Sequence, residues 1–114
     1  MLKIIKSDFE FVDERGKLVQ LIHDGYKQIN VITSKKNVLR GGHYHKRNAE
    51  AFYIISGALK LTVNEQEYHF GAGNFFGIEP YDMHSFFFKE DTVLVSMYDQ
   101  GVENTDGTKD IFTE

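Results

Sequence analysis

The chain has 114 residues and no cysteine. This length is sufficient for one folded domain with its own core, and the lack of cysteine excludes disulfides, thiolate metal ligands and a thiol nucleophile. The net charge of −4 argues against a nucleic-acid surface, and a charged start with no long apolar run argues against a signal peptide or membrane span, so we expect a cytoplasmic protein without nucleic-acid or membrane partners.

In the first third of the chain, apolar residues recur with a period of two, which predicts strands. Asp24-Gly25 is a dipeptide typical of hairpin turns, and it separates the last two strands of this region. The predicted strands cover residues 1–6, 9–12, 17–22 and 26–33.

The same period continues to residue 98, and no segment has a convincing helical period. About ten short antiparallel strands at close spacing are typical of an all-β sandwich or small barrel. The later strands are predicted at residues 40–45, 51–55, 59–63, 67–70, 74–78, 84–88 and 92–98.

Residues 99–114 differ in character from the barrel predicted over residues 1–98, because they are acidic and largely polar. Two interpretations of this C-terminal tail are open. The tail is a frayed terminus, or Ile111-Phe112 docks on a partner subunit.

A candidate metal site lies in the middle of the chain. His43 and His45 are two residues apart, so a strand would present both imidazoles on one face. Glu50 begins the next apolar run after a four-residue turn. A two-stranded hairpin would then bring two imidazoles and a carboxylate together, which is most of a metal site.

The spacing of these residues resembles the first motif of the cupins, with His43, His45, Glu50 and Gly57 at the family's positions. A looser second motif begins at Gly73, where Asn74 replaces the usual acidic residue. The resemblance implies a double-stranded β-helix, or jelly-roll barrel, in which His84 is the fourth ligand of one divalent metal ion. Three imidazoles and a carboxylate suit Zn, Ni, Mn, Fe or Co.

A finer resemblance is to small cupins that process nucleotide sugars, the dTDP-4-keto-6-deoxyglucose ketoisomerases and the dTDP-4-dehydrorhamnose 3,5-epimerases. It is carried by residues 13–16 (Asp-Glu-Arg-Gly) and 40–46 (Arg-Gly-Gly-His-Tyr-His-Lys). It implies that Arg40 contacts substrate and that His43 acts as a general base. A histidine that ligates a metal cannot use the same lone pair to remove a proton.

Besides these residues, Tyr98 and Tyr53 are candidate general acids, although a strand tyrosine also packs in many proteins. Arg40 is suited to binding an anionic ligand such as a sugar nucleotide. Short-strand sandwiches must cover their edges, and this favours a homodimer.

The residues leave three functions open. The first is an isomerase or epimerase acting next to the ketone of a nucleotide-linked keto-sugar. The second is a metal-dependent dioxygenase, which the ligand set alone would allow. The third is a non-catalytic cupin that binds a small sugar or anion.

Overall fold

The computed structural model describes residues 1–113, and within them the chain forms eleven strands and no helix. In chain order the strands are β1 (Lys3–Ile4), β2 (Phe9–Asp13), β3 (Gly16–Gln20), β4 (Gln28–Ser34), β5 (Leu39–His43), β6 (Glu50–Ser56), β7 (Ala58–Val63), β8 (Gln66–Gly71), β9 (Phe75–Ile78), β10 (His84–Phe88) and β11 (Thr92–Tyr98).

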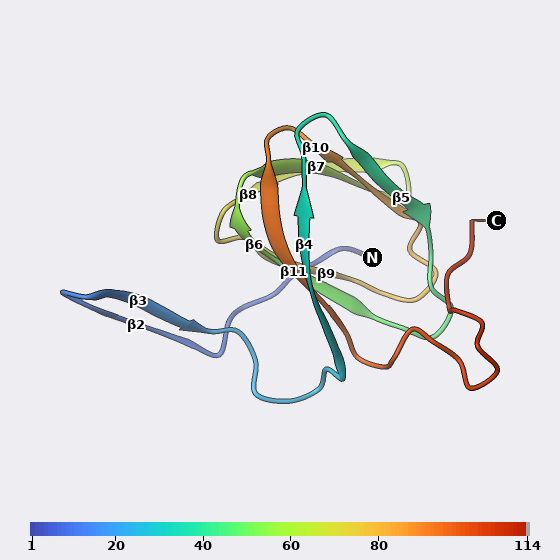
Figure 1. Ribbon diagram of the computed structural model, residues 1–114, viewed down its shortest axis with the longest axis horizontal. Helices are drawn as coiled ribbons and strands as arrows, with labels where there is room; N and C mark the ends of the chain where they lie inside the picture. Colours follow the sequence, from blue (N-terminus) through green and yellow to red (C-terminus); the bar gives the residue numbers. More distant parts are fainter. Residues whose placement is uncertain (114) are drawn as a thin grey trace.

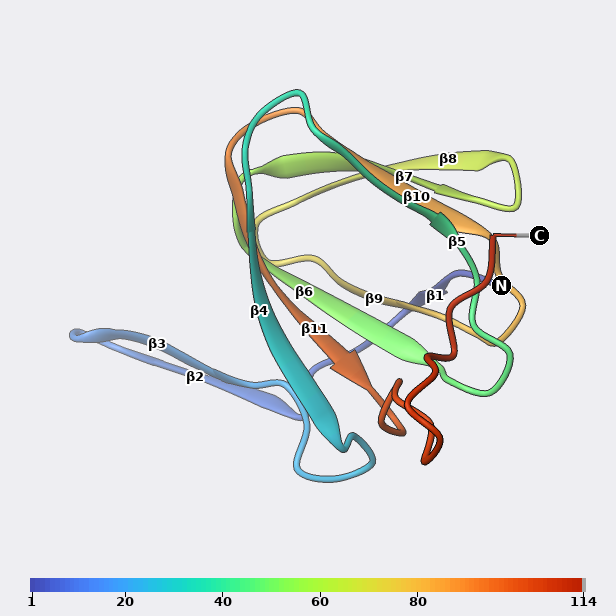
Figure 2. The same ribbon diagram turned by 45° about the vertical axis from the view of Figure 1, so that its right-hand side comes forward.

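Two antiparallel sheets face each other and form the barrel (Figures 1 and 2). One has five strands in the order β1-β9-β6-β11-β4, and the other has four in the order β5-β10-β7-β8. This is an all-β jelly-roll fold, as expected: the strand pattern predicted an all-β sandwich or small barrel, and the resemblance to the cupins implied the jelly roll. No helix within residues 1–113 is long and apolar enough to cross a membrane.

Alternation along the strands places apolar side chains between the two sheets. In β7, for example, Leu59, Leu61 and Val63 are buried while the residues between them are partly exposed. Phe52 and Phe76 from the five-stranded sheet pack against this cluster. Each such side chain contributes about 1.5–3 kcal/mol through burial, and together they fix the separation of the sheets.

The β2–β3 hairpin forms a separate two-stranded sheet that extends away from the barrel (Figure 1, blue). Phe11 lies opposite Leu18 in its register, so the two side chains share a face with Phe9. All three are about half exposed, at 54%, 54% and 50%. The hairpin therefore presents an apolar face to solvent.

Two predicted connections differ from the structure. Asp24-Gly25 does not close a hairpin, because β3 pairs only with β2 while β4 joins the five-stranded sheet. Likewise, β5 and β6 do not pair: β5 pairs with β10, and β6 lies between β9 and β11. His43 and Glu50 therefore come from opposite sheets and meet across the barrel.

Gly57 has a direct steric reason to be glycine. Its φ is +99°, and a Cβ at this position would lie 2.5 Å from the Asp91 carbonyl oxygen and 2.7 Å from Thr92 Cα. The residue joins β6 to β7 where the chain passes from one sheet to the other. Only glycine permits both the left-handed backbone and this close approach.

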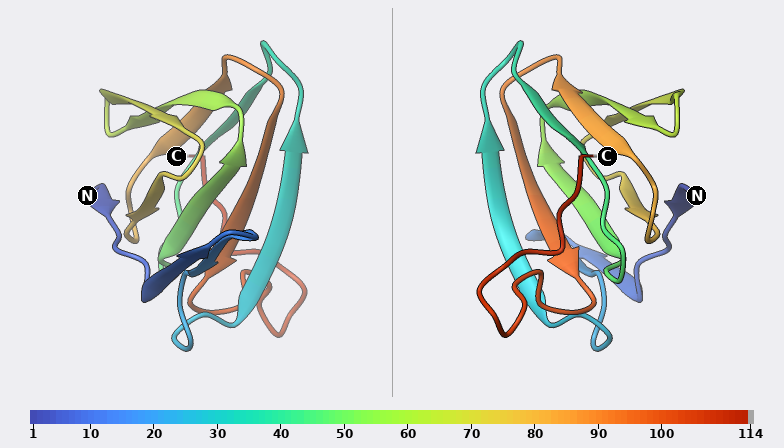
Figure 3. Two further views of the ribbon diagram at one scale, coloured as in Figure 1. Left: turned by 90° about the vertical axis from the view of Figure 1, so that its left-hand side faces the viewer. Right: turned by 90° about the vertical axis from the view of Figure 1, so that its right-hand side faces the viewer.

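The tail beyond β11 folds back onto its own chain and runs past the ends of β5 and β6 (Figures 2 and 3). Tyr44 and Phe112 form an isolated antiparallel bridge with N–O distances of 2.8 and 2.9 Å. The described part of the tail is thus not frayed. Docking of Ile111-Phe112 on a partner subunit stays a prediction, now constrained by the contact that Phe112 makes within its own chain.

Candidate functional site

Three histidines converge at one end of the barrel. His43 ends β5, His45 lies just beyond it, and His84 begins β10. Their candidate ligating nitrogens all lie within 4.8 Å of one another. His45 is not in a regular strand, yet its ring centroid is 5.1 Å from that of His43. The two imidazoles therefore lie close together as predicted, although His45 lies after the end of β5 and not within the same strand as His43.

The Glu50 carboxylate lies beside these rings and is only 5% exposed. Its Oε1 is 3.2 Å from His45 Nε2 and 3.9 Å from His84 Nε2. Its Oε2 accepts a 2.5 Å hydrogen bond from the Ser96 hydroxyl of β11. A buried carboxylate costs several kcal/mol unless it is compensated, and these groups supply the compensation.

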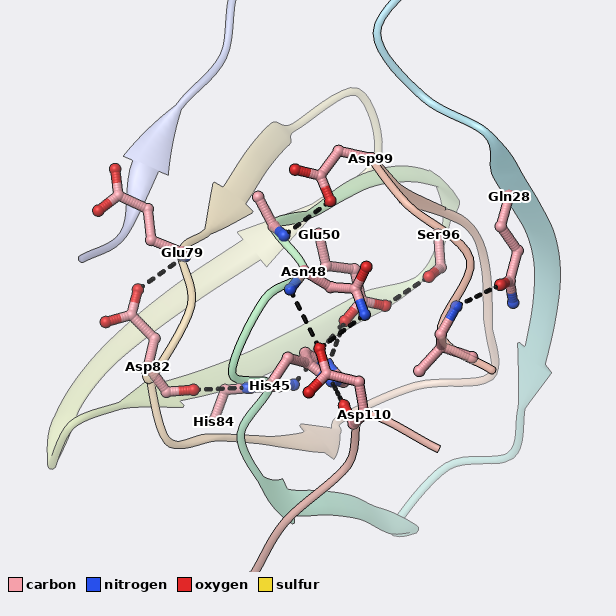
Figure 4. A network of polar contacts seen from close by, with 12 residues as sticks. Gln28, His45, Asn48, Glu50, Glu79, Asp82, His84, Ser96, Asp99 and Asp110 are labelled. Carbon is pink, nitrogen blue, oxygen red and sulfur yellow. Dashed lines mark hydrogen bonds and ion pairs between the residues drawn. The ribbon is translucent and has the colours of Figure 1, made fainter. Parts of the chain in front are cut away.

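Backbone carbonyls set the orientation of two of the rings (Figure 4). His45 Nδ1 is 2.6 Å from the Asp110 carbonyl oxygen, and His84 Nδ1 is 2.9 Å from the Asp82 carbonyl oxygen. A carbonyl can only accept, so each Nδ1 carries the hydrogen. Both Nε2 atoms consequently face Glu50 and the interior of the site.

A cavity of about 330 Å³ opens onto the site, at the lower end of the size range of small-molecule sites. His43, Glu50 and His84 form its polar part. The rest of the wall is mostly apolar: Ile32, Phe52, Phe86, Phe88 and Leu94. Such a wall excludes water and strengthens polar interactions within the cavity.

Arg40 and Tyr98, two of the predicted site residues, also line the cavity. Arg40 reaches from β5 across to β4, where Nε donates to Ser34 Oγ over 3.2 Å. Tyr98 lies opposite Glu50 in the β11–β6 register, and its ring packs edge-on against His45.

Tyr53 is placed elsewhere. It lies three residues after Glu50 on β6 and therefore points to the other face of the sheet. There it packs against Phe75, with ring centroids 6.0 Å apart, outside the cavity. The structure thus separates Tyr53 from the other predicted site residues and removes the geometric support for a catalytic role.

Residues 33–99 match the family model for the cupin domain, which covers more than half of the chain. The chain is a cupin. A search of curated protein sequences gives no match for it.

Solved structures share the fold of this cupin at low sequence identity. The QdtA 3,4-ketoisomerase from Thermoanaerobacterium thermosaccharolyticum is 23% identical, with a TM-score of 0.79 over 99% of this chain and 87% of that one. The WlaRB TDP-quinovose 3,4-ketoisomerase from Campylobacter jejuni is 17% identical, with a TM-score of 0.84 over 99% and 92%. The rmlC epimerase from Mycobacterium tuberculosis is 16% identical, with a TM-score of 0.72 over 92% and 70%.

The electrostatics of the site divide its histidines into two kinds. Burial, together with the neighbouring His84 and His45, lowers the pKa of His43 to about 4, and burial also lowers the pKa of His84. Burial acts in the same direction on His45, but hydrogen bonds to Glu50 and the Asp110 carbonyl outweigh it and raise the pKa of His45. Without a metal, His45 is thus the one of the three histidines whose surroundings favour the protonated ring, next to Glu50.

Tyr98 is held in its protonated form. Burial and the adjacent Glu50 carboxylate raise the pKa of its phenol. A neutral phenol is a hydrogen-bond donor, so Tyr98 is suited to stabilise a developing negative charge on a ligand oxygen.

The donor set also fits a divalent metal ion. Three imidazole nitrogens are grouped, and a buried carboxylate adjoins two of them. Both Nδ1–H groups are held by carbonyls, an arrangement that commonly supports metal-ligating histidines. His43, His45, His84 and Glu50 are therefore the residues that could hold a metal in this cupin.

Several residues of the site were not predicted from the sequence: Asn48, Asp82, Ser96 and Asp110. Ser96 lies two positions before Tyr98 on β11, so strand alternation would have placed it on the same face. No comparable sequence pattern marks Asp110, which lies 60 residues beyond Glu50 in a polar tail.

We predict that the histidines of the metal-free protein titrate far apart. The ring of His43 should stay neutral until the pH falls to about 4, whereas His45 should stay protonated above its ordinary value of 6.5. NMR titration of the imidazole resonances, assigned with His43→Asn and His45→Asn variants, measures both values.

The pKa shifts of His43 and His45 make the free energy of unfolding depend on pH in opposite directions. The unfolded chain binds a proton at His43 near pH 6.5, so the stabilisation from neutral His43 should be lost as the pH falls from 6.5 towards 4. The contribution of His45 is present below pH 6.5 and is lost as the pH rises through its higher folded value. Two histidines titrating together near 6.5 would contradict the described geometry.

Proposed function

We propose that this cupin is an isomerase or epimerase that acts next to the ketone of a nucleotide-linked keto-sugar. The observation that carries the proposal is the cavity, which brings a neutral imidazole (His43) and a protonated phenol (Tyr98) onto one mostly apolar wall. Structures of similar fold support it, since one is a 3,4-ketoisomerase in complex with TDP and another is a TDP-quinovose 3,4-ketoisomerase.

The chemistry requires a base and a donor on the same substrate. His43 removes the proton from the carbon beside the ketone, and the C–H electron pair moves towards the carbonyl oxygen. Tyr98 donates a hydrogen bond to that oxygen as negative charge develops there. In a ketoisomerisation the proton returns to the former carbonyl carbon, whose oxygen takes up a proton, while the hydroxyl on the first carbon loses its proton and becomes the new ketone. In an epimerisation a proton is delivered to the first carbon from a donor on its opposite face, and the ketone re-forms in place.

Arg40 is the group proposed to bind the anionic part of the substrate. Its side chain lines the cavity and is held from one side by β4, through Ser34 Oγ at 3.2 Å and the Thr33 carbonyl at 3.4 Å. A guanidinium fixed in this way is pre-organised to pair with a phosphate oxygen. The phosphates would then lie towards β4 while the sugar occupies the cavity.

We also propose that His43, His45, His84 and Glu50 can bind a divalent metal ion. When bound, such an ion would polarise a carbonyl and make the neighbouring C–H more acidic. In that form His43 contributes its lone pair to the metal and is no longer available as a base. Tyr98 keeps its role as a donor.

The active form of the protein is either the metal-loaded one or a metal-free one. One observation favours the metal-free form. His45 is positioned between two acceptors, the Asp110 carbonyl and Glu50, and this favours the protonated ring beside the buried carboxylate. His43 and His84 both line the cavity and both have a lowered pKa, and His43 is the one proposed as the base. His43 is a metal ligand in the metal-loaded form and the base in the metal-free form, so experiments on His43 can distinguish the two forms.

We further propose a homodimer in which the β2–β3 hairpin packs on a second copy. Its apolar face, formed by Phe9, Phe11 and Leu18, is exposed, and the outer side of the edge strand β4 exposes Ile29 and Val31. A lone two-stranded hairpin is marginally stable in water. A second copy covering these surfaces would stabilise it.

Incubation of dTDP-4-keto-6-deoxyglucose with the protein in D₂O should place deuterium on a carbon that flanks the ketone, detected by NMR and mass spectrometry. Because His43 supplies the base, His43→Asn should slow this exchange by about 10²–10⁴-fold. The matched control is His69→Asn, at an exposed histidine on β8 that contacts Lys89. No deuterium uptake with either dTDP- or UDP-linked 4-keto-sugars would exclude proton abstraction from these substrates and favour a binding function.

Glu50→Gln should lower the content of bound metal while leaving a folded β protein, because the amide keeps the volume of the side chain but loses its charge. Elemental analysis of protein loaded with Zn, Ni, Mn, Fe or Co measures the change, and circular dichroism checks the fold. Glu79→Gln, a partly exposed carboxylate paired with Lys3, is the control. Full metal retention would remove Glu50 from the ligand set, and bound Fe with O₂ uptake would favour a dioxygenase.

The homodimer predicts a solution mass of about twice 13.2 kDa by light scattering. Phe11→Ser should shift the mass towards that of one chain, since it removes the centre of the apolar hairpin face. Ile55→Ser, at an exposed residue of β6, should leave the dimer intact. A wild-type protein of 13.2 kDa at micromolar concentration would contradict the proposal.

A further inference from the structure

We propose that Asp110 is a positioning residue for the site: its carboxylate holds the turn between His45 and Glu50, and its carbonyl orients the His45 imidazole. The proposal rests on the proposed function only in taking His45 as part of the site. It concerns a segment that the cupin family match, residues 33–99, does not include.

The Asp110 carboxylate fills a ring of backbone donors in this turn. Oδ1 accepts from the Lys46 amide at 3.0 Å, and Oδ2 accepts from the Arg47 and Asn48 amides at 3.0 and 3.1 Å. The Asn48 side chain donates to Oδ2 at 2.8 Å. Asp110 is 3% exposed and Asn48 is fully buried, so the two bonds from Asn48 are buried, while those from the Lys46 and Arg47 amides are partly buried.

The carbonyl of the same residue binds His45. The distance from His45 Nδ1 to the Asp110 carbonyl oxygen is 2.6 Å, and this contact requires a hydrogen on Nδ1. It therefore turns Nε2 towards Glu50 Oε1, 3.2 Å away. One residue thus holds both the turn that follows His45 and the Nδ1–H group of its ring.

The tail is held in place on both sides of Asp110. The Asp110 amide donates to the Val102 carbonyl at 2.8 Å, and Phe112 forms the bridge with Tyr44. Lys46 Nζ lies 4.2 Å from the centre of the Phe112 ring, a favourable cation–π contact. The geometry at His45 consequently depends on a segment that is distant in sequence.

His84 provides an internal comparison. Its Nδ1 is also held by a backbone carbonyl, but that carbonyl belongs to Asp82, only two residues away on the same loop. A change in the tail should therefore disturb the ring of His45 and spare that of His84. A general loss of stability would affect both rings.

The test is NMR of the ¹⁵N-labelled, metal-free full chain. The wild type should show protected Nδ1–H signals from both His45 and His84. In Asp110→Ala, the His45 signal should exchange with water at least about tenfold faster, while the His84 signal is unchanged. Asp106→Asn, at an exposed carboxylate of the same tail that accepts hydrogen bonds from Thr108, should leave both signals unchanged.

Zinc titration provides a second readout. Loss of a group that orients a ligating histidine weakens metal binding by about 10–100-fold, and this is the effect expected for Asp110→Ala. If the wild type binds no zinc, zinc is excluded as the ion of this site, and the NMR result still decides the role of Asp110.

Unchanged His45 exchange in a folded Asp110→Ala variant would overturn the inference. If that variant does not fold, Asp110→Asn takes its place, because the amide keeps the volume and one acceptor oxygen. Its His45 signal should exchange faster than in the wild type by a smaller factor, and an unchanged signal would likewise overturn the inference.

Discussion

The buried carboxylate of Glu50 is the constraint on which the site depends. An anion that is 5% exposed needs partners on several sides, and these come from three elements: His45 after β5, His84 at the start of β10 and Ser96 in β11. Ser96 lies on β11, beside β6 in the same sheet, whereas His45 and His84 approach from the other sheet and reach Glu50 only because the two sheets pack in this register. The apolar packing between the sheets therefore determines the polar chemistry at their end.

The topology explains why a short stretch of sequence can supply both sides of this site. The chain leaves the four-stranded sheet at His43, turns through residues 46–49, and enters the five-stranded sheet at Glu50. A simple hairpin would have kept these residues side by side on one sheet. Because the chain changes sheets instead, imidazole and carboxylate face each other across the barrel end. The turn must then be held firmly, and the Asp110 carboxylate supplies this restraint from outside the barrel.

The sequence predicted most strands because alternation of apolar residues records burial directly: residues 84–88 and 92–98 match β10 and β11 residue for residue. The spacing of His43, His45 and Glu50 also predicted that these three residues lie together, and the resemblance to the cupins added His84 to them. The pairing of the strands was harder to predict from the sequence. Asp24-Gly25 favours a hairpin locally, whereas the pairing of β4 with β11 depends on the whole sheet. Tyr53 could have been excluded from the site by parity alone, as it is an odd number of residues from Glu50. The role of Asp110 depends on tertiary contacts across more than 60 positions, and no local pattern reports these.

The three imidazoles differ in pKa because the groups that contact their nitrogens differ. His45 has an acceptor at each nitrogen, His84 has a carbonyl at one nitrogen and a more distant carboxylate at the other, and His43 contacts the two other rings. Burial lowers the pKa of His43, and the neighbouring His84 and His45 add to this effect, whereas at His45 the hydrogen bonds to Glu50 and the Asp110 carbonyl outweigh burial and raise the pKa. A base and a metal ligand both require a neutral imidazole. The neutral ring of His43 is therefore compatible with either role. A metal ion bound by all three rings would have to displace the proton on His45 Nε2, which faces Glu50 Oε1. The Asp110 carbonyl holds Nδ1–H and would orient the ring for such an ion, but it also raises the pKa of His45 and so favours the competing proton.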